Sequence, residues 1–373
     1  MRLRLLFTLL LTTFVVAETA GSTTFTLRDG SRAEVEIVAD GLGIPWGMAF
    51  LSDDELIVTE REGGIVLLDL KSGDVNELSG GSQVRASGQG GMLDVAVPPG
   101  YTSGDWLYFT YAKEINDQGV TTLARARLEG TLLNDWTELL VTKSASSTGR
   151  HFGSRIAVGA EDLLYITVGD RGVRENGQDL ETHAGTILRL HRDGRVPSDN
   201  PFTSQPEALP EIWSYGHRNV QGLVYDRNNE RLWAIEHGPR GGDELNLIVA
   251  KGNYGWPIVS HGMEYWGPVK VGEATTKPGY QDPLKVYIPS IAPGSLVLYE
   301  HEAFADWKGS LFAGALKLRH INRIILDEAG IPVGEERLLE DFGQRIRAIA
   351  VGPEGYLYFS TDSGMIGRIK PAE

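Results

Sequence analysis

The 373-residue sequence contains no cysteine, so disulfide bonds and thiolate metal sites are not available to it. Its longest apolar run, from Leu5 to Ala17, has 13 residues. That is too short to cross a bilayer, which needs about 20 residues. The sequence also lacks an HExxH zinc motif, a nucleophile elbow, a Walker A loop and a Rossmann glycine fingerprint. These absences exclude thiol chemistry and the site classes that such motifs mark.

The apolar run at the N-terminus predicts a secretory signal peptide. Arg2 and Arg4 precede it, and Val15 and Ala17 stand at positions −3 and −1 of a cut after residue 17. We therefore expect residues 1–17 to be removed and the mature protein to reside in the periplasm, without membrane insertion. The cut would take the net charge from −15 to −17. So acidic a surface disfavours nucleic acid and anionic lipid as partners.

Short β-strands dominate the mature sequence, because apolar residues recur with a period of two and no segment has the period of a long amphipathic helix. Glycine is abundant, with 46 residues, and clusters of glycine or acidic residues precede the strands. Strands are predicted at 55–60, 163–168, 231–236, 309–314 and 355–360, with following strands at 64–69 and 321–326.

Strand pairs that recur at roughly 40–70 residues indicate an all-β fold, a β-propeller of four-stranded blades. At about 55–60 residues per blade the chain would hold six blades, with five or seven as alternatives. No linker divides residues 18–373, so we expect a single propeller domain. Residues 24–38 are predicted to supply a strand that closes the ring against the last blade.

Several turns are unusually polar, and in a propeller such turns gather at one mouth although they lie far apart in sequence. They include residues 87–92, 149–155, 215–219, 236–244, 315–319 and 344–347. Lys317 with Arg319 and Arg345 with Arg347 place cations two residues apart, which on a strand puts both on one side. In so acidic a protein they favour a polyanionic ligand. Solvated strand faces are the alternative.

His151 lies in a glycine-rich turn beside Arg150 and Arg155. Neighbouring cations lower an imidazole pKa and favour the neutral form, which suits a general base. A merely solvated loop histidine is the alternative. In the turn at residues 236–244, Asp243 and Glu244 offer hard oxygen ligands of the kind that Ca²⁺ prefers.

Taken together, these segments resemble the soluble quinoprotein glucose/sorbosone dehydrogenase family, and most closely its periplasmic aldose sugar dehydrogenases. The matching segments keep the family's order: IPWGMAF (44–50), GQGGMLDVAV (88–97), RHFGSRI (150–156), LYITVGDRG (164–172), GTILRL (185–190), YGHRNVQGL (215–223), EHGPRGGDELNLI (236–248), GNYGWP (252–257), ALKLR (315–319) and RIRAIAVGPEGYLY (345–358). The resemblance implies a six-bladed propeller that binds pyrroloquinoline quinone (PQQ) and Ca²⁺.

The resemblance also assigns roles to residues. His151 falls at the position of the catalytic base, and Glu244 and Tyr254 at a Ca²⁺ site. Gly238 and Pro239 match the pair whose carbonyls hold the Ca²⁺ of the cofactor. Residues at quinone-contacting positions are Gln89, Arg218, Asn219, Tyr265, Lys317, Arg319, Arg345 and Arg347. The sequence departs from the glucose dehydrogenase branch at Arg150, where that branch has an aspartate, so a glucose-specific pocket is not expected.

The implied reaction is oxidation of an aldose at its anomeric carbon to the lactone. His151 would take the hydroxyl proton while a hydride passes to PQQ, and the electrons would leave to an unidentified acceptor. Two alternatives come from other classes, a Ca²⁺-dependent propeller lactonase or hydrolase and a non-catalytic propeller that binds a sugar or a protein. The protein would be a monomer or a homodimer.

Overall fold

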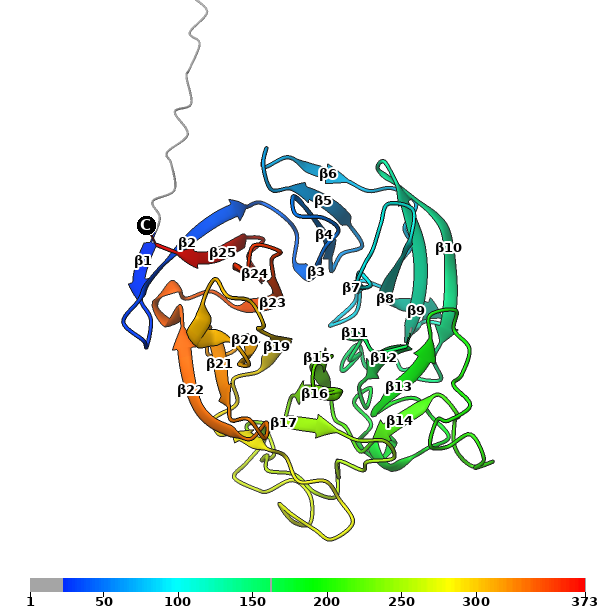
Figure 1. Ribbon diagram of the computed structural model, residues 1–373. Coiled ribbons are helices and arrows are strands. Elements are labelled where there is room, and N and C mark those ends of the chain that lie inside the picture. The colour runs from blue at the N-terminus through cyan, green and yellow to red at the C-terminus, as the bar shows by residue number, and fades with distance from the viewer. Residues whose placement is uncertain (1–22, 162, 373) are drawn as a thin grey trace, which may run out of the picture.

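The computed structural model describes residues 23–161 and 163–372, so the expected signal peptide lies outside the described residues. Within them, strands β1 to β25 form six antiparallel sheets arranged radially around an axis (Figure 1). The described residues contain no α-helix, and their helical segments are the 3-10 turns η1 (Arg174–Gln178), η2 (Ala305–Trp307) and η3 (Glu340–Phe342). The predicted all-β, six-bladed propeller is confirmed, and the five- and seven-bladed alternatives are wrong.

Each of five blades is a run of four consecutive strands. The first two hold β3 (Pro45–Phe50), β4 (Glu55–Glu60), β5 (Ile65–Asp69), β6 (Val75–Glu77), and β7 (Met92–Ala96), β8 (Trp106–Ile115), β9 (Gln118–Glu129), β10 (Leu132–Val141). The third and fourth hold β11 (Ile156–Val158), β12 (Leu163–Val168), β13 (Thr186–His191), β14 (Ile212–Tyr215), and β15 (Val220–Asp226), β16 (Arg231–Glu236), β17 (Asp243–Ile248), β18 (Lys285–Tyr287). The fifth holds β19 (Pro293–Leu298), β20 (Leu311–Ala315), β21 (Ile321–Leu326) and β22 (Pro332–Leu338).

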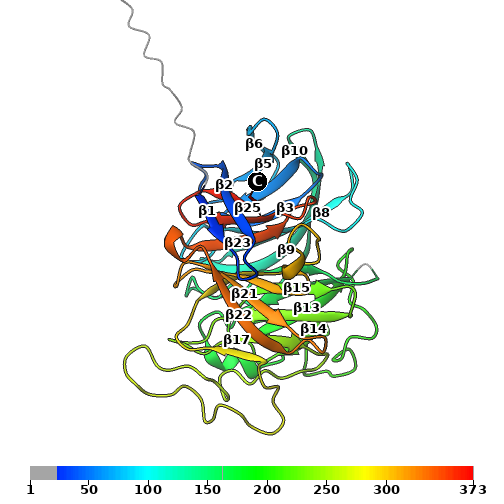
Figure 2. The same cartoon turned by 60° about the vertical axis from the view of Figure 1, so that its left-hand side comes forward.

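The sixth blade joins the two ends of the described chain. It contains β23 (Ile346–Val351), β24 (Leu357–Thr361) and β25 (Ile366–Pro371), and then β2 (Arg32–Ala39) and β1 (Thr23–Thr26). β2 pairs antiparallel with β25, and Figure 2 shows the two strands side by side. The predicted closure is therefore confirmed. The segment predicted as one strand is two, because the chain reverses at Gly30, whose φ is +86°.

The predicted strand bounds are accurate for some strands and begin too early for others. Those at 55–60, 163–168, 231–236 and 321–326 coincide with β4, β12, β16 and β21. Those at 309–314 and 355–360 begin two residues too early. Gly309 and Gly355 have φ values of +74° and +87°, a turn conformation that a strand does not adopt.

The topology places two sets of turns at one end of the axis. The innermost strands are β3, β7, β11, β15, β19 and β23, as Figure 1 shows. In an antiparallel blade, the turn that leads into the innermost strand lies at the same end as the turn between the second and third strands. Apolar side chains fill the space between neighbouring sheets, so this end is held rigidly. No helix among residues 23–161 and 163–372 has the length and apolarity to cross a bilayer.

Candidate functional site

A cavity of about 250 Å³ opens where the turns of all six blades meet at this end of the axis. Four of the predicted residues line it: Gln89, Asn219, Arg345 and Arg347. The other lining residues are Trp46, Arg61, Phe152, Gly153, Gln221, His237, Ala292, Leu316 and Asp362. The prediction that distant polar turns converge at one mouth is thus correct.

His151 lies in the turn before β11, between the cavity residue Gln89 and a buried carboxylate. Its backbone N–H donates to Gln89 Oε1 at 2.7 Å, and its Nδ1 lies 2.6 Å from Asp170 Oδ1. Asp170 is itself held by the N–H of Gly172 at 2.7 Å and by Trp256 Nε1 at 2.8 Å. Because a carboxylate accepts at Nδ1, that nitrogen carries the proton and Nε2 carries the lone pair.

Burial lowers the pKa of His151 below its ordinary value, and the charges of Arg218 and Arg150 act in the same direction. The hydrogen bond to Asp170 opposes this shift but does not cancel it. The predicted contribution of Arg155 is wrong. Its guanidinium turns to the axis and donates to Asp94 Oδ1 at 2.9 Å. The imidazole is therefore neutral at neutral pH, as a general base must be.

Arg218 and Asn219 follow His217 in the turn before β15, and both are buried. Arg218 Nη1 donates to the carbonyl of His237 at 3.1 Å, and its backbone N–H donates to Glu236 Oε2 at 2.7 Å. Asn219 Oδ1 accepts from the N–H of Gly153 at 3.1 Å. Its Nδ2 has no hydrogen-bond partner in the part of the chain that the structure describes. The site thus contains fixed N–H donors beside His151.

Arg345 and Arg347 share one carboxylate that the sequence did not reveal. Arg347 Nε donates to Asp362 Oδ1 at 2.9 Å, and Arg345 Nε donates to Asp362 Oδ2 at 2.7 Å. Arg345 Nη1 also donates to the carbonyl of Leu316 at 3.0 Å. Burial raises the pKa of Asp362, but the two arginines outweigh it and bring that pKa below 3.8. Arg345 and Arg347 therefore share a single counter-charge at the cavity, which Arg61 also lines.

Four predicted cofactor contacts do not line the cavity, and one of them, Arg218, lines the small space beside it. Lys317 and Arg319 are exposed in the turn between β20 and β21, not on a strand, and Arg319 has a φ of +58°. The expectation that strand alternation aims this pair together is wrong, because the strand ends at Ala315. Tyr265 is 67% exposed in the long loop between β17 and β18. The cation cluster at the cavity is thus smaller than predicted.

The four residues predicted to bind metal surround a separate space of about 10 Å³, next to the larger cavity. Gly238, Pro239, Glu244 and Tyr254 line it, together with Arg218 and Glu236. A space of this size holds about one water or one small ion. Burial raises the pKa of Glu244 well above its ordinary value, and the charge of Glu236 adds to the shift. A cation in this space would relieve that destabilisation.

The described residues contain no group of three or more His, Asp or Glu side chains that converge on one point. Further ligands would have to be backbone carbonyls or water, which Ca²⁺ accepts. The Tyr254 hydroxyl is already engaged, since it donates to the Leu247 carbonyl at 2.7 Å and accepts from the Val249 N–H at 3.0 Å. Only the carbonyl of Tyr254 is left as a metal ligand.

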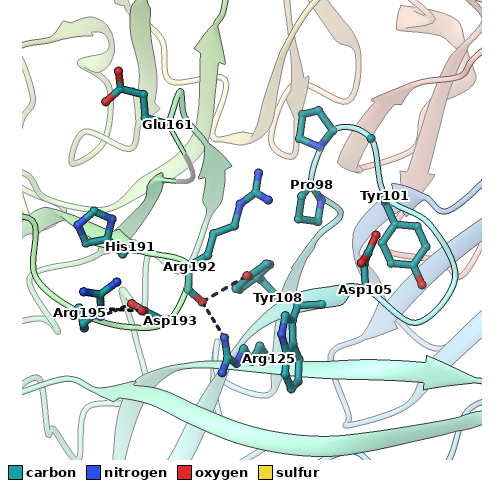
Figure 3. Close-up of a pocket in the computed structure, with 13 residues that line it drawn as sticks. Pro98, Tyr101, Asp105, Tyr108, Arg125, Glu161, His191, Arg192, Asp193 and Arg195 are labelled. Atoms are coloured by element: carbon teal, nitrogen blue, oxygen red, sulfur yellow. Dashed lines mark hydrogen bonds and ion pairs between the residues drawn. The ribbon is translucent and has the colours of Figure 1, made fainter.

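A larger cavity of about 450 Å³ lies at the opposite end, between the second and third blades (Figure 3). None of the predicted residues lines it. Tyr108 Oη and Arg125 Nη1 both donate to the carbonyl of Arg192, at 3.2 and 3.3 Å. Arg125 also stacks on Trp106 at 4.1 Å. These contacts join two neighbouring blades, so we regard this cavity as an interblade groove.

Sequence reasoning missed Asp170, Asp362 and Trp46. Asp170 stands in the turn GDRG (169–172), directly after a strand. The glycines at both ends of this turn indicate a constrained backbone around its polar residues. Asp362 lies in the Thr-Asp-Ser-Gly turn between β24 and β25, which reads as an ordinary hairpin turn. Nothing in the sequence distinguishes Trp46 from a core residue.

Comparison with known proteins agrees with this geometry. The sequence profile of the family described as Glucose / Sorbosone dehydrogenase matches residues 42–369. The aldose sugar dehydrogenase YliI of Escherichia coli is 37% identical over 348 residues, which cover 90% of this chain and 92% of YliI. The apo-form structure of the soluble aldose sugar dehydrogenase from E. coli has a TM-score of 0.87 at 34% identity, over 91% of this chain and all of that one. The PQQ-bound aldose sugar dehydrogenase of Streptomyces coelicolor has a TM-score of 0.75 at 28% identity, over 94% of this chain and 98% of that one.

Proposed function

This chain belongs to the Glucose / Sorbosone dehydrogenase family, and from that premise we propose that it is a PQQ-dependent aldose sugar dehydrogenase. It oxidises an aldose at the anomeric carbon to the lactone and passes two electrons to an external acceptor. The observation that carries this proposal is the part-buried His151–Asp170 pair beside a cavity lined by three arginines and a buried amide. The name of the PQQ-bound relative from S. coelicolor supports the choice of cofactor.

The residues at the cavity fit PQQ by charge. The cofactor carries three carboxylates, and Arg345 and Arg347 together outnumber the single carboxylate of Asp362. Planar guanidinium groups suit such carboxylates because they bind them through paired hydrogen bonds. Gln89 and Asn219 would contribute polar contacts. Lys317, Arg319 and Tyr265 would reach the cofactor only at the exposed rim. Bound PQQ would supply the two-electron acceptor for the sugar.

His151 would act as the general base. With Nδ1 bonded to Asp170, the lone pair of Nε2 is available to take the proton of the anomeric hydroxyl. Asp170 would then stabilise the imidazolium and keep the ring in position. Arg218 and Asn219 would offer N–H donors to negative charge that develops on the cofactor. Asp170 would thereby orient His151, a role that Arg150, which precedes His151 in sequence, cannot fill.

Ca²⁺ would occupy the small space beside Glu244. Its ligands would be the Glu244 carboxylate and the carbonyls of Gly238, Pro239 and Tyr254, with water completing the shell. The ion would act as a Lewis acid at the cofactor. The proposal also includes a secretory signal over residues 1–17 and a periplasmic location. The electron acceptor is unidentified, and the protein would be a monomer or a homodimer.

A serine, a histidine and a glutamate near the site are arranged like a hydrolase triad, but they do not support the alternative of a propeller hydrolase. Ser214 Oγ lies 2.9 Å from His217 Nε2, and His217 Nδ1 lies 2.9 Å from Glu236 Oε1. Ser214 and His217 are fully buried, so no substrate reaches the hydroxyl. We interpret this arrangement as structural. A non-catalytic sugar-binding propeller would not need the oriented imidazole of His151.

The direct test adds PQQ and Ca²⁺ to apo-protein and measures cofactor binding, followed by dye reduction across a panel of aldoses. We expect saturable binding and sugar-dependent reduction. His151→Gln should retain PQQ but lower kcat by about 10²–10⁴-fold, because Gln cannot accept a proton. Since burial holds the pKa of His151 below 6.5, the wild-type rate should decline only below that pH. Normal turnover of His151→Gln with bound cofactor would place the base elsewhere.

A further inference from the structure

Arg61 lines the 250 Å³ cavity, but neither the sequence motifs nor the proposed chemistry assigns it a role. It directly follows β4, in the turn that leads to β5 of the first blade. Arg345 and Arg347, the other two arginines of the lining, stand at the start of β23 in the sixth blade. A third guanidinium group thus belongs to the cavity and comes from the neighbouring blade (Figure 1).

The backbone of Arg61 is fixed between the first two blades. Its N–H donates to the Ile44 carbonyl at 2.9 Å, and its carbonyl accepts from the Met92 N–H at 3.0 Å. This approach depends on Gly91, whose φ is +150°, because a Cβ at that position would overlap the Arg61 carbonyl oxygen. Gly91, in the polar turn at residues 87–92, therefore lets the two blades meet at Arg61.

Most of the N–H groups of the Arg61 guanidinium are free. Nη2 donates to Glu62 Oε1 at 2.8 Å, whereas Nε and Nη1 have no hydrogen-bond partner within residues 23–161 and 163–372. The side chain of Glu62 is 61% exposed and that of Arg61 is 30% exposed, so solvent weakens this ion pair. Arg345 and Arg347, in contrast, both donate to Asp362. Arg61 is therefore the cavity arginine whose donors are least engaged.

The positive charge of Arg61 lies close enough to the other two arginines to act on them. Burial lowers the pKa of Arg347 below its ordinary value, and the charges of Arg345 and Arg61 act in the same direction, whereas the carboxylate of Asp362 opposes them. Three cations around one cavity repel one another. An anionic group that entered the cavity among them would relieve this repulsion.

We propose that Arg61 is a cofactor-binding residue that pairs with a carboxylate of PQQ. This inference rests on the proposed function. The three carboxylates of PQQ lie at separate points around the edge of its ring system, so cations from a single blade would not meet all of them. Arg345 and Arg347 belong to the sixth blade and Arg61 to the first. The free N–H groups of Arg61 would donate charge-assisted hydrogen bonds to the carboxylate that the other two arginines leave unpaired.

The test compares Arg61→Met, which keeps the aliphatic part of the side chain but removes its charge and donors, with Arg61→Lys, which keeps the charge. Titration of each apo-variant with PQQ in the presence of Ca²⁺, followed by the absorption of PQQ, gives the affinity. We expect Arg61→Met to bind PQQ about tenfold more weakly, as the loss of one charge-assisted hydrogen bond in a partly exposed position predicts. The affinity of Arg61→Lys should lie between those of wild type and Arg61→Met.

Arg85→Met is the matched control. Arg85 also pairs with an exposed glutamate, since its Nη1 lies 3.0 Å from Glu114 Oε2, and its side chain is 23% exposed. It is absent from the described lining of the cavity. Arg85→Met should therefore bind PQQ as wild type does, and melting temperatures would show that each variant is folded.

The outcomes separate this inference from the proposed function. If wild-type protein does not bind PQQ, the proposed function itself fails. If wild type binds PQQ and Arg61→Met matches its affinity, or if Arg85→Met weakens binding as much as Arg61→Met does, the role of Arg61 is overturned. An unchanged PQQ affinity with a raised KM for the sugar would assign Arg61 to the substrate and would overturn the inference equally.

Discussion

Two clusters of ion pairs in the sixth blade differ in their charge balance. One lies at its inner edge, and the other joins β2 to β25 in the outer half of the sheet and is called the outer edge for short. At the outer edge, Lys370 pairs with Glu34 at 2.8 Å and Arg368 pairs with Glu36 at 3.0 Å. Lys370 also contacts Glu36 at 3.0 Å, so two cations face two carboxylates. At the inner edge, Arg345 and Arg347 divide Asp362 between them.

Burial does not explain the difference. The side chain of Arg347 is 12% exposed and that of Asp362 is 17%, against 28% for Lys370 and 18% for Glu34. What distinguishes the inner cluster is an uncompensated positive charge beside a cavity. The outer cluster joins β2 to β25 and closes the ring. An imbalance of charge, more than the presence of arginines, therefore marks the place where an anionic ligand would bind.

The largest expected effect follows from Arg347→Ala. Removal of this buried guanidinium would leave a PQQ carboxylate and Asp362 short of a partner, at a cost of about 2–5 kcal/mol in cofactor binding. Arg368→Ala at the outer edge is the matched control and should bind PQQ as wild type does. Titration with PQQ measures both variants. Equal affinity in the two would remove the distinction between the edges.

Arg345→Ala and Lys317→Ala should follow in that order. The side chain of Arg345 is 46% exposed, so solvent screens its charge more than that of Arg347. Lys317 is exposed and outside the cavity lining, so its removal should change PQQ affinity least. The same titration ranks all three. A larger loss for Lys317→Ala than for Arg347→Ala would mean that the exposed turn closes on the cofactor.

Asp362→Asn tests the imbalance in the opposite direction. Loss of the shared carboxylate would leave both arginines to the cofactor, and we expect PQQ to bind about tenfold more tightly, a gain of about 1.4 kcal/mol. The apparent affinity should also depend more steeply on salt, because more charge is left uncompensated. Weaker binding would show that Asp362 serves mainly to hold the arginines in position.

The smallest effects are expected at the outer edge. Lys370→Ala should lower stability by about 0.2–1 kcal/mol for each partly exposed pair lost, without a change in PQQ affinity. Thermal unfolding of apo-protein measures the first effect and PQQ titration the second. A collapse of the fold would mean that these pairs, and not the backbone pairing of β2 with β25, hold the ring closed.

Both edges should lose stability in acid. Burial raises the pKa of Glu36, but its hydrogen bonds with Lys370 and Arg368 lower it more, and the net pKa lies below 4.5. Asp362 likewise lies below 3.8. A carboxyl whose pKa is lower in the folded state contributes stability that is complete above its unfolded pKa and is lost as pH falls through the folded value. The stability difference between wild type and Glu36→Gln should therefore shrink below pH 4.5, and that for Asp362→Asn below pH 3.8, in thermal melts across pH.

Much of the fold could be predicted because its signals are local. Strands such as β4 and β16 are short apolar runs between turn-forming clusters, and each blade depends on pairing between neighbours in sequence. The site was predicted in part. Asn219 stands in a turn of conspicuous composition and Arg347 directly after one, whereas Asp170 and Asp362 look like ordinary turn residues. Arg155, which is close to His151 in sequence, turns away to the axis.

By itself, the amino-acid sequence determined the all-β class, an approximate blade count and the supply of cations and a histidine in glycine-rich turns. These properties follow from the backbone preferences of adjacent residues. Only the tertiary structure decided which of those groups meet. Asp170 orients His151 from 19 residues away, and Arg155 reaches Gly294 across 139 residues. Such contacts depend on how six sheets pack around one axis, and no local pattern in the sequence encodes the direction in which a single side chain then points.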